Sequence, residues 1–224
     1  MNTLKEKLRI AMLLAINSGF IDGYTYFHFS ERFAGMQTGN LIQAGINLAN
    51  GKIQLALGFA LPILFFIVGI GFKIAYSHFL KMEEEVQHFI LIQGLGVLAI
   101  TLLHAFVITL TPPIYIGLLS FFMAIQADTF TNTHGLAYNS VFGTGNIRSF
   151  STNLMQFFLT KDKEKLSHAS IYFGLILSFF VGAVFSTLLL NVFGTWTLLG
   201  SCFILLIVYL IFVFSKNKKI MELA

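Results

Sequence analysis

Two aspartates stand inside otherwise apolar stretches of the sequence. Asp22 and Asp128 are 106 residues apart, and Thr25 and Thr131 follow them at the same distance. An ionised carboxylate costs about 3 kcal/mol in the middle of a membrane-spanning helix, so it is expected to face protein or water. The four residues predict either a proton- or solute-binding site, or two carboxylates that hydrogen-bond a short helix of their own half and fix the fold.

The same spacing relates two copies of the tripeptide Thr-Gly-Asn. The copies are Thr38, Gly39 and Asn40, and Thr144, Gly145 and Asn146. Threonine or asparagine can cap the free N–H groups at the start of a helix, and glycine permits close backbone approach. A helix N-terminus is electropositive and can meet an anion or a polar oxygen. The tripeptides therefore predict the starts of two short helices, at 38–49 and 144–159.

Several amides and two histidines accompany these motifs. The amides are candidates for lining a polar cavity: Gln37, Gln43, Asn47, Gln126, Asn132 and Asn153. His28 and His134 also match across the two copies; they can relay protons, but the end of a helix at headgroup level is the more usual place for such a residue. The sequence contains no P-loop, zinc-ligand spacing, nucleophile elbow or Rossmann fingerprint. We therefore expect no enzyme activity, no cofactor and no metal.

The composition is that of a membrane protein. Of the 224 residues 56% are hydrophobic and 11% are charged, whereas soluble domains carry about 25% charged residues. The mean hydropathy is +0.80. The net charge of +4 arises from clusters at the ends of apolar runs, which is typical of helices oriented in a lipid bilayer rather than of a nucleic-acid-binding protein.

Six stretches have the length and hydropathy expected of spanning helices. They cover residues 11–29, 55–76, 89–110, 114–132, 170–190 and 196–214. The two Thr-Gly-Asn segments are shorter: a helix over 38–49 would extend about 18 Å, against a hydrocarbon core of about 30 Å. We expect an all-α fold with six spans and two broken or re-entrant helices, although full crossing by the short segments stays open.

The basic residues support this count. With six spans and a cytoplasmic N-terminus, 12 of the 14 lysines and arginines lie on the cytoplasmic side, and only Arg32 and Lys52 lie outside. If both short segments crossed the membrane, Lys73 and Lys81 would move to the outer side, against the positive-inside rule. The prediction is a multi-pass protein of the plasma membrane with both termini in the cytoplasm.

The spacing of 106 residues extends beyond the two motifs. Eight identities fall within 27 aligned positions, and seven of them are not aliphatic. After a slip of seven residues, VGIGF at 68–72 aligns with VGAVF at 181–185. We divide the chain into repeats at 1–110 and 111–224. Three crossings per repeat invert the second repeat relative to the first, and inverted repeats with interrupted helices recur in secondary transporters.

Specific segments resemble the YoaK-like family of bacterial integral membrane proteins, a domain-of-unknown-function family with Thr-Gly motifs. The segments are INSGFIDGYTYF, FAGMQTGN, AIQAD and GTGN, and the matching residues are Asp22, Phe33, Thr38, Gly39, Asn40, Thr144 and Gly145. One departure is Gln126-Ala127, where many members have Gln-Asn. The resemblance covers nearly the whole chain and implies a bacterial plasma-membrane protein of about six helices, without supplying a substrate.

These observations favour a small secondary transporter of an unidentified polar solute, with proton coupling through Asp22 or Asp128 as one mechanism open to it. A passive channel with two half-helices around a narrow pore is an alternative. A non-transporting membrane scaffold or sensor is another, and it predicts a dry interior. The size of the chain allows a homodimer, but no motif locates an interface.

Overall fold

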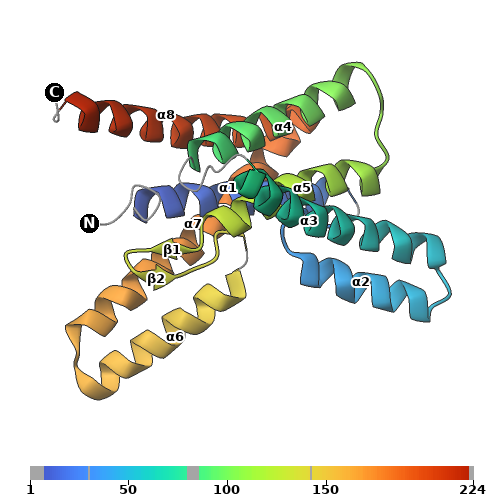
Figure 1. Cartoon of the computed structure of the whole chain (residues 1–224). Coiled ribbons are helices and arrows are strands. Elements are labelled where there is room, and N and C mark those ends of the chain that lie inside the picture. Colours follow the sequence, from blue (N-terminus) through green and yellow to red (C-terminus); the bar gives the residue numbers. More distant parts are fainter. Residues whose placement is uncertain (1–7, 30, 80–85, 142, 222–224) are drawn as a thin grey trace.

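The computed structural model describes residues 8–29, 31–79, 86–141 and 143–221, and nearly all of them are helical (Figure 1). The elements are α1 (Leu8–His28), α2 (Gln37–Ala49), α3 (Ile53–Phe79), α4 (Val86–Phe106), α5 (Pro112–Thr129), β1 (Asn132–Thr133), β2 (Leu136–Ala137), α6 (Gly143–Thr160), α7 (Lys163–Phe193), the 3-10 helix η2 (Gly194–Leu198) and α8 (Leu199–Met221). The predicted all-α class is confirmed, and a helix lies over each of the eight predicted segments.

Several boundaries differ from the prediction, and two of the differences are instructive. The helix expected at 170–190 begins earlier, at Lys163, because Asp162 caps it: the Glu164 N–H donates to Asp162 Oδ1 over 2.9 Å. The helix expected at 114–132 ends at Thr129 and is followed by a two-stranded hairpin. The hairpin turns through His134 (φ 51°) and Gly135 (φ 76°), and two positive φ values suit a tight turn between antiparallel strands.

In the described part of the chain, three helical segments are long and apolar enough to cross a membrane. They are Ile53–Phe79, Val86–Phe106 and Lys163–Ser215, the last of which includes α7, η2 and most of α8. Large apolar side chains such as Leu64 on α3 and Phe180 on α7 are exposed on these segments. The chain is therefore a helical membrane protein, with apolar outer faces that suit lipid contact.

The helices that contain the two aspartates are more buried than these segments. In α1, 12 of 21 residues are buried, and in α5, 10 of 18 are buried. In α3 only 6 of 27 residues are buried. A helix surrounded by other helices can contain polar residues because protein groups satisfy them. This position explains why α1 and α5 are less apolar than α3 and α4.

The contacts between helices occur in matched pairs. α1 packs along α7 and α5 along α3; α2 packs against α3 and α6 against α7. α4 packs against α8, and the contacts of α4 with α5 are matched by those of α8 with α1. In Figure 1, α2 and α3 extend to one side of the molecule and α6 and α7 to the other. Exchanging α1–α4 with α5–α8 therefore leaves the pattern of contacts unchanged.

Glycines permit the closest of these contacts at matching positions. A Cβ atom on Gly69 of α3 would overlap the Phe121 carbonyl of α5, and one on Gly182 of α7 would overlap the Ile16 carbonyl of α1. The segments before α2 and α6 also approach each other, since a Cβ on Gly35 would lie 2.7 Å from Val141 Cγ1. Gly35 and Val141 are 106 residues apart, so the two halves touch at equivalent positions.

Candidate functional site

Asp22 holds the connection between α1 and α2. The Gly35 N–H donates to Asp22 Oδ1 over 2.6 Å, and the Met36 N–H donates to Asp22 Oδ2 over 3.2 Å. The side chain is buried, with 3% of its surface exposed. These amides stand at the start of α2, where backbone N–H groups have no helical partner. For Asp22, the structure has the arrangement of the structural alternative, a carboxylate bound to the short helix of its own half.

The asparagines of the two tripeptides make the same pair of hydrogen bonds. Asn40 accepts from the Phe33 N–H over 3.0 Å and donates to the Phe33 carbonyl over 2.7 Å. Asn146 accepts from the Asn139 N–H over 3.3 Å and donates to the Asn139 carbonyl over 2.8 Å. Each asparagine thus binds both backbone groups of the residue seven positions earlier. We call this arrangement the asparagine clamp; it fixes the entry of the chain into α2 and α6.

The predicted capping by threonine or asparagine is wrong for α2. Its N-cap residue is Met36, which makes no side-chain cap, and Thr38 is exposed. Asp22 of α1 instead accepts from the Gly35 and Met36 N–H groups beside this helix start, which is the structural alternative stated for the aspartates. Thr144 is also exposed, and the residue before α6 lies outside the described part of the chain. Gly39 packs tightly, since a Cβ there would lie 2.8 Å from the Phe33 ring, whereas Gly145 has open space beside it.

Most of the predicted cavity-lining amides have local roles. Asn47 donates to the Gln43 carbonyl and Asn153 to the Ser149 carbonyl, each over 2.8 Å and one helical turn back. Both side chains, like that of Gln43, are half-buried. Asn132 lies in β1 and is exposed, so it does not line a cavity. These amides are placed along α2, α6 and the hairpin rather than around one shared space.

Gln37 differs because it connects the two halves. It donates to the Ala34 carbonyl over 2.6 Å and to Ser120 Oγ on α5 over 3.3 Å. Its Oε1 accepts from Asn40 Nδ2 over 2.9 Å. The start of α2 is therefore hydrogen-bonded to the opposite half through one amide side chain.

Asp128 has a different kind of partner from Asp22. Its Oδ2 lies 2.8 Å from Lys73 Nζ on α3, and the two side chains are 34% and 21% exposed. Lys73 Nζ also lies 5.9 Å from the centre of the Phe89 ring. The ion pair joins α3 of the first half to α5 of the second. The structure thus gives the two aspartates separate partners, and Lys73 was not among the predicted site residues.

The repeated threonines and histidines do not share one environment. Thr25 is buried and donates to the Asp22 carbonyl over 3.3 Å, whereas Thr131 is exposed and accepts from Asn132 Nδ2 over 3.2 Å. His28 at the end of α1 and His134 in the hairpin turn are both exposed. Exposure at the end of a helix suits the interfacial interpretation of His28, whereas His134 lies in a hairpin.

Gln126 is the predicted residue that lies deepest in the protein. Its side chain is 1% exposed, and its Nε2 is placed to donate to three acceptors. These are the Leu14 carbonyl at 3.1 Å, Ser18 Oγ at 2.8 Å and Ser140 Oγ at 3.2 Å. Gln126 therefore connects α5 to α1 and to the segment before α6.

The other end of the Gln126 amide extends this group. Its Oε1 accepts from Asn17 Nδ2 and from Gln93 Nε2, each over 3.0 Å. Ser201 on α8 donates to Asn17 Oδ1 over 2.6 Å. We call Gln126 and its side-chain partners the amide network, with the members Asn17, Ser18, Gln93, Gln126, Ser140 and Ser201. All six are at most 1% exposed.

Five of these six residues were missed by the sequence analysis. Asn17, Ser18, Gln93, Ser140 and Ser201 have no identical counterpart 106 residues away, so the comparison of repeats did not select them. Their signal is the cost of burying a polar side chain in an apolar helix. Asn17 and Gln93 are amides within apolar runs and could have been found on that ground.

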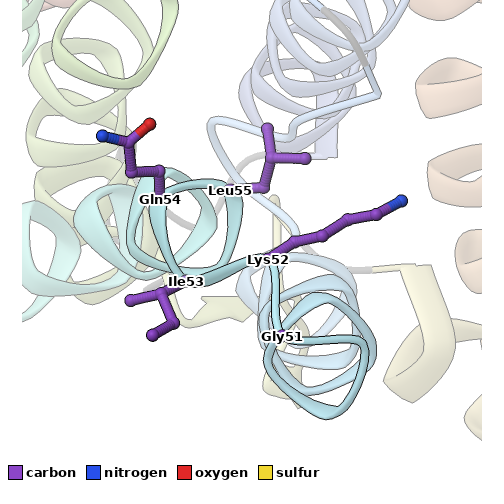
Figure 2. Close-up of a pocket in the computed structure, with 5 residues that line it drawn as sticks. All are labelled: Gly51, Lys52, Ile53, Gln54 and Leu55. Atoms are coloured by element: carbon purple, nitrogen blue, oxygen red, sulfur yellow. The ribbon is translucent and has the colours of Figure 1, made fainter.

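The pocket in Figure 2 lies elsewhere, at the turn between α2 and α3. Gly51, Lys52, Ile53, Gln54 and Leu55 line it, and all five residues are exposed. It contains none of the predicted site residues. Within the described part of the chain, no three histidine, cysteine, aspartate or glutamate side chains are grouped as metal ligands.

Comparison with known proteins identifies one family. The family model described as "Protein of unknown function (DUF1275)" matches residues 10–211. This is the family to which YoaK-like proteins belong, so the resemblance seen in the sequence is confirmed. Comparison with curated proteins and with solved structures gives no match.

Proposed function

The chain belongs to the DUF1275 family of proteins of unknown function, and from this premise we propose that it is a small secondary transporter of a small polar solute. The proposal places it in a bacterial plasma membrane with six crossings and cytoplasmic termini. Its two halves, 1–110 and 111–224, have opposite orientations in the membrane. Transport then consists of movements of the two halves that expose a polar site alternately to the two sides.

The observation that carries this proposal is the buried amide network at the join of the two halves. Asn17 and Gln93 belong to the first half, and Gln126 and Ser201 to the second. Polar side chains inside a membrane protein destabilise it unless they are paired, and they commonly mark the path of a solute. A site between repeats near the middle of the membrane is the arrangement of many secondary transporters.

The matched helix contacts support the proposed topology. α1 begins and α8 ends on the same side of the molecule, which suits an even number of crossings (Figure 1). α2 follows α1, and α6 follows α5, after a break that the asparagine clamp fixes in both halves. Interrupted helices of this kind supply the polar backbone that transporter sites need inside a membrane.

Asp128 is a better candidate for proton coupling than Asp22. The Asp22 carboxylate is occupied by two backbone N–H groups. Asp128 is partly exposed and its partner is Lys73 in the opposite half. Protonation of Asp128 would remove its attraction to Lys73 and free α5 to move relative to α3.

A non-transporting scaffold is a second candidate. The observation that favours it is the binding of Asp22 to backbone groups, which a purely structural role would explain. A scaffold predicts that no solute enters vesicles that contain the protein. The dependence of solute flux on concentration in the same vesicles also distinguishes a carrier, whose flux saturates, from a passive channel, whose flux does not.

The transport experiment uses purified protein in proteoliposomes with and without an imposed pH gradient. Entry of urea, glycerol, glycine, acetate and ammonium is followed, with protein-free vesicles as the control. Saturable entry of at least one probe that changes with the gradient supports the proposal. The Asp128→Asn variant should lose the response to the gradient, because its side chain no longer takes up a proton. Absence of entry for every probe would favour the scaffold.

The orientation of the halves is tested by labelling cysteines from the two sides of the membrane. Cys202→Ser removes the only cysteine of the chain, and Lys52→Cys and Lys161→Cys are then introduced separately. Lys52 lies between α2 and α3, and Lys161 lies between α6 and α7. An impermeant thiol reagent should reach the two positions from opposite faces. Labelling of both from one face would overturn the inverted arrangement.

A further inference from the structure

One atom of the amide network has no hydrogen-bond partner among the residues that the structure describes. Gln93 is fully buried on α4, and no donor among the described residues contacts its Oε1. Its Nε2 donates to Gln126 Oε1 over 3.0 Å and lies 3.9 Å from Met123 Sδ. Buried acceptors are satisfied in the great majority of cases, so this oxygen requires an explanation.

The neighbouring groups determine which atom of Gln93 is unpaired. The Leu14 carbonyl can only accept, so it must face the NH₂ group of Gln126. Gln126 Oε1 therefore faces Asn17 and Gln93, and Gln93 must present its own NH₂ group there. If the nitrogen and oxygen of the Gln93 amide were exchanged, its oxygen would face Gln126 Oε1, and two acceptors would meet without a hydrogen between them. The unpaired atom is an acceptor on the amide.

Retention of this acceptor lowers the stability of the fold. A buried acceptor without a partner has lost its hydrogen bonds to water and gained none in the protein. An apolar side chain of similar size would avoid that loss. The amide nitrogen of Gln93 serves the fold through its bond to Gln126, whereas the oxygen is better explained by a ligand.

We propose that Gln93 Oε1 recognises the transported solute, and that the solute is an uncharged small molecule with N–H or O–H donors. This inference rests on the proposed transport function and names its substrate class. The side chains of the amide network are all amides or hydroxyls, so they offer an ion no opposite charge. A buried ion without an opposite charge would lose its hydration at a large cost in free energy, whereas an uncharged donor can bind the Gln93 oxygen without that cost.

The position of the atom suits this role. Gln93 lies on α4, and Ser201, another member of the network, lies on α8. α4 and α8 pack against each other where the two halves meet. A movement of the halves relative to each other therefore changes the surroundings of this oxygen, as alternating access requires.

The test compares Gln93→Leu with Gln43→Leu in the full chain. Both variants exchange an amide for a side chain of similar size, but Gln43 lies on α2, outside the network. Entry of urea and glycerol, and of ammonium and acetate as charged probes, is measured in proteoliposomes. Thermal unfolding of each protein is followed in detergent.

The expected result is entry of urea or glycerol that Gln93→Leu slows about tenfold, because one hydrogen bond to the solute is lost. The Tm of Gln93→Leu should stay close to that of the unaltered protein, since removal of the unpaired acceptor offsets loss of the bond to Gln126 Oε1, which keeps its bond from Asn17. Gln43→Leu should leave entry unchanged.

Three results would overturn the inference while leaving the transport function in place. They are an unchanged rate in Gln93→Leu, a fall of rate together with a fall of Tm, which indicates a structural role, and entry of charged probes alone. If the unaltered protein admits none of the four probes, the inference and the proposed function are both rejected.

Discussion

The helical chain is interrupted twice, between α1 and α2 and between α5 and α6. The two breaks share one hydrogen-bonding feature and differ in another. Both have the asparagine clamp, with Asn40 on Phe33 and Asn146 on Asn139. The aspartates that precede the breaks diverge: Asp22 binds the start of α2, and Asp128 pairs with Lys73. The clamp connects residues seven positions apart, so local sequence preserves it, whereas the partner of each aspartate depends on the helix packed beside it.

The difference between the aspartates has its origin in the neighbouring helices. The alignment of VGIGF with VGAVF makes Ser186 of α7 the sequence counterpart of Lys73 of α3. Ser186 lies beside α1, since a Cβ atom on Gly23 would be 2.5 Å from its Oγ. A lysine is therefore available to Asp128 on α3, while the matching residue near Asp22 is an uncharged serine. In the first half, Asp22 thus fixes the break between α1 and α2. In the second half, Asp128 instead makes a contact with the first half.

The largest expected effect is the loss of stability in Asp22→Ala compared with Asp128→Ala. Asp22→Ala leaves two backbone N–H groups at the start of α2 without their acceptor, which should lower the free energy of unfolding by about 3 kcal/mol. Asp128→Ala should lower it by about 1 kcal/mol, because its ion pair is partly exposed. Unfolding of both variants in mixed micelles measures the difference. Equal losses would show that the two aspartates have the same structural role.

The asparagine clamps should be nearly equivalent. Asn40→Ala and Asn146→Ala each remove two hydrogen bonds to backbone groups, and each should destabilise the protein by about 2 kcal/mol. Asn40 also donates to Gln37 Oε1, so its loss should be the larger of the two. The same unfolding measurement compares them. A loss confined to one variant would show that the clamp stabilises only one of the breaks.

The glycines of the tripeptides should respond with opposite signs. Gly39→Ala places a methyl group against the Phe33 ring, and the required shift should cost about 1 kcal/mol. Gly145→Ala meets open space in a helix and should stabilise the protein by about 0.5 kcal/mol. Thermal unfolding of the two variants shows the sign directly. Destabilisation by both would mean that α6 packs against something at Gly145.

The smallest expected effect is the coupling between Lys73 and Asp128. A double-mutant cycle with Lys73→Met and Asp128→Asn should give about 0.5 kcal/mol, since exposure screens the pair. The matching cycle with Ser186→Ala and Asp22→Asn should give no coupling, because no ion pair joins those residues. A coupling of similar size in both cycles would remove the distinction between the halves.

Much of the fold could be predicted because hydropathy and spacing are local properties. All eight predicted segments are helices, and the repeated asparagines do mark the starts of α2 and α6. The sequence offered Asp22 both as a partner of the first short helix and as a solute site, but it could not decide between these roles, because the carboxylate reaches Gly35 and Met36 only after α1 has folded against the chain that follows it. Lys73 and the five members of the amide network other than Gln126 escaped prediction for a related reason: comparison of the repeats selects residues that the halves share, and these residues differ between the halves.

The sequence by itself determined that the protein is helical, that it has apolar outer faces, and that its two halves contain matching polar motifs. Those properties follow from composition and from contacts between residues close in the chain. Only the tertiary structure decided that Asp22 fixes a helix start, that Asp128 meets Lys73, and that Gln93 joins Gln126 while no donor among the described residues contacts its oxygen. The physical reason is that a buried polar group takes its partner from whichever helix packs beside it, and that choice is made in three dimensions.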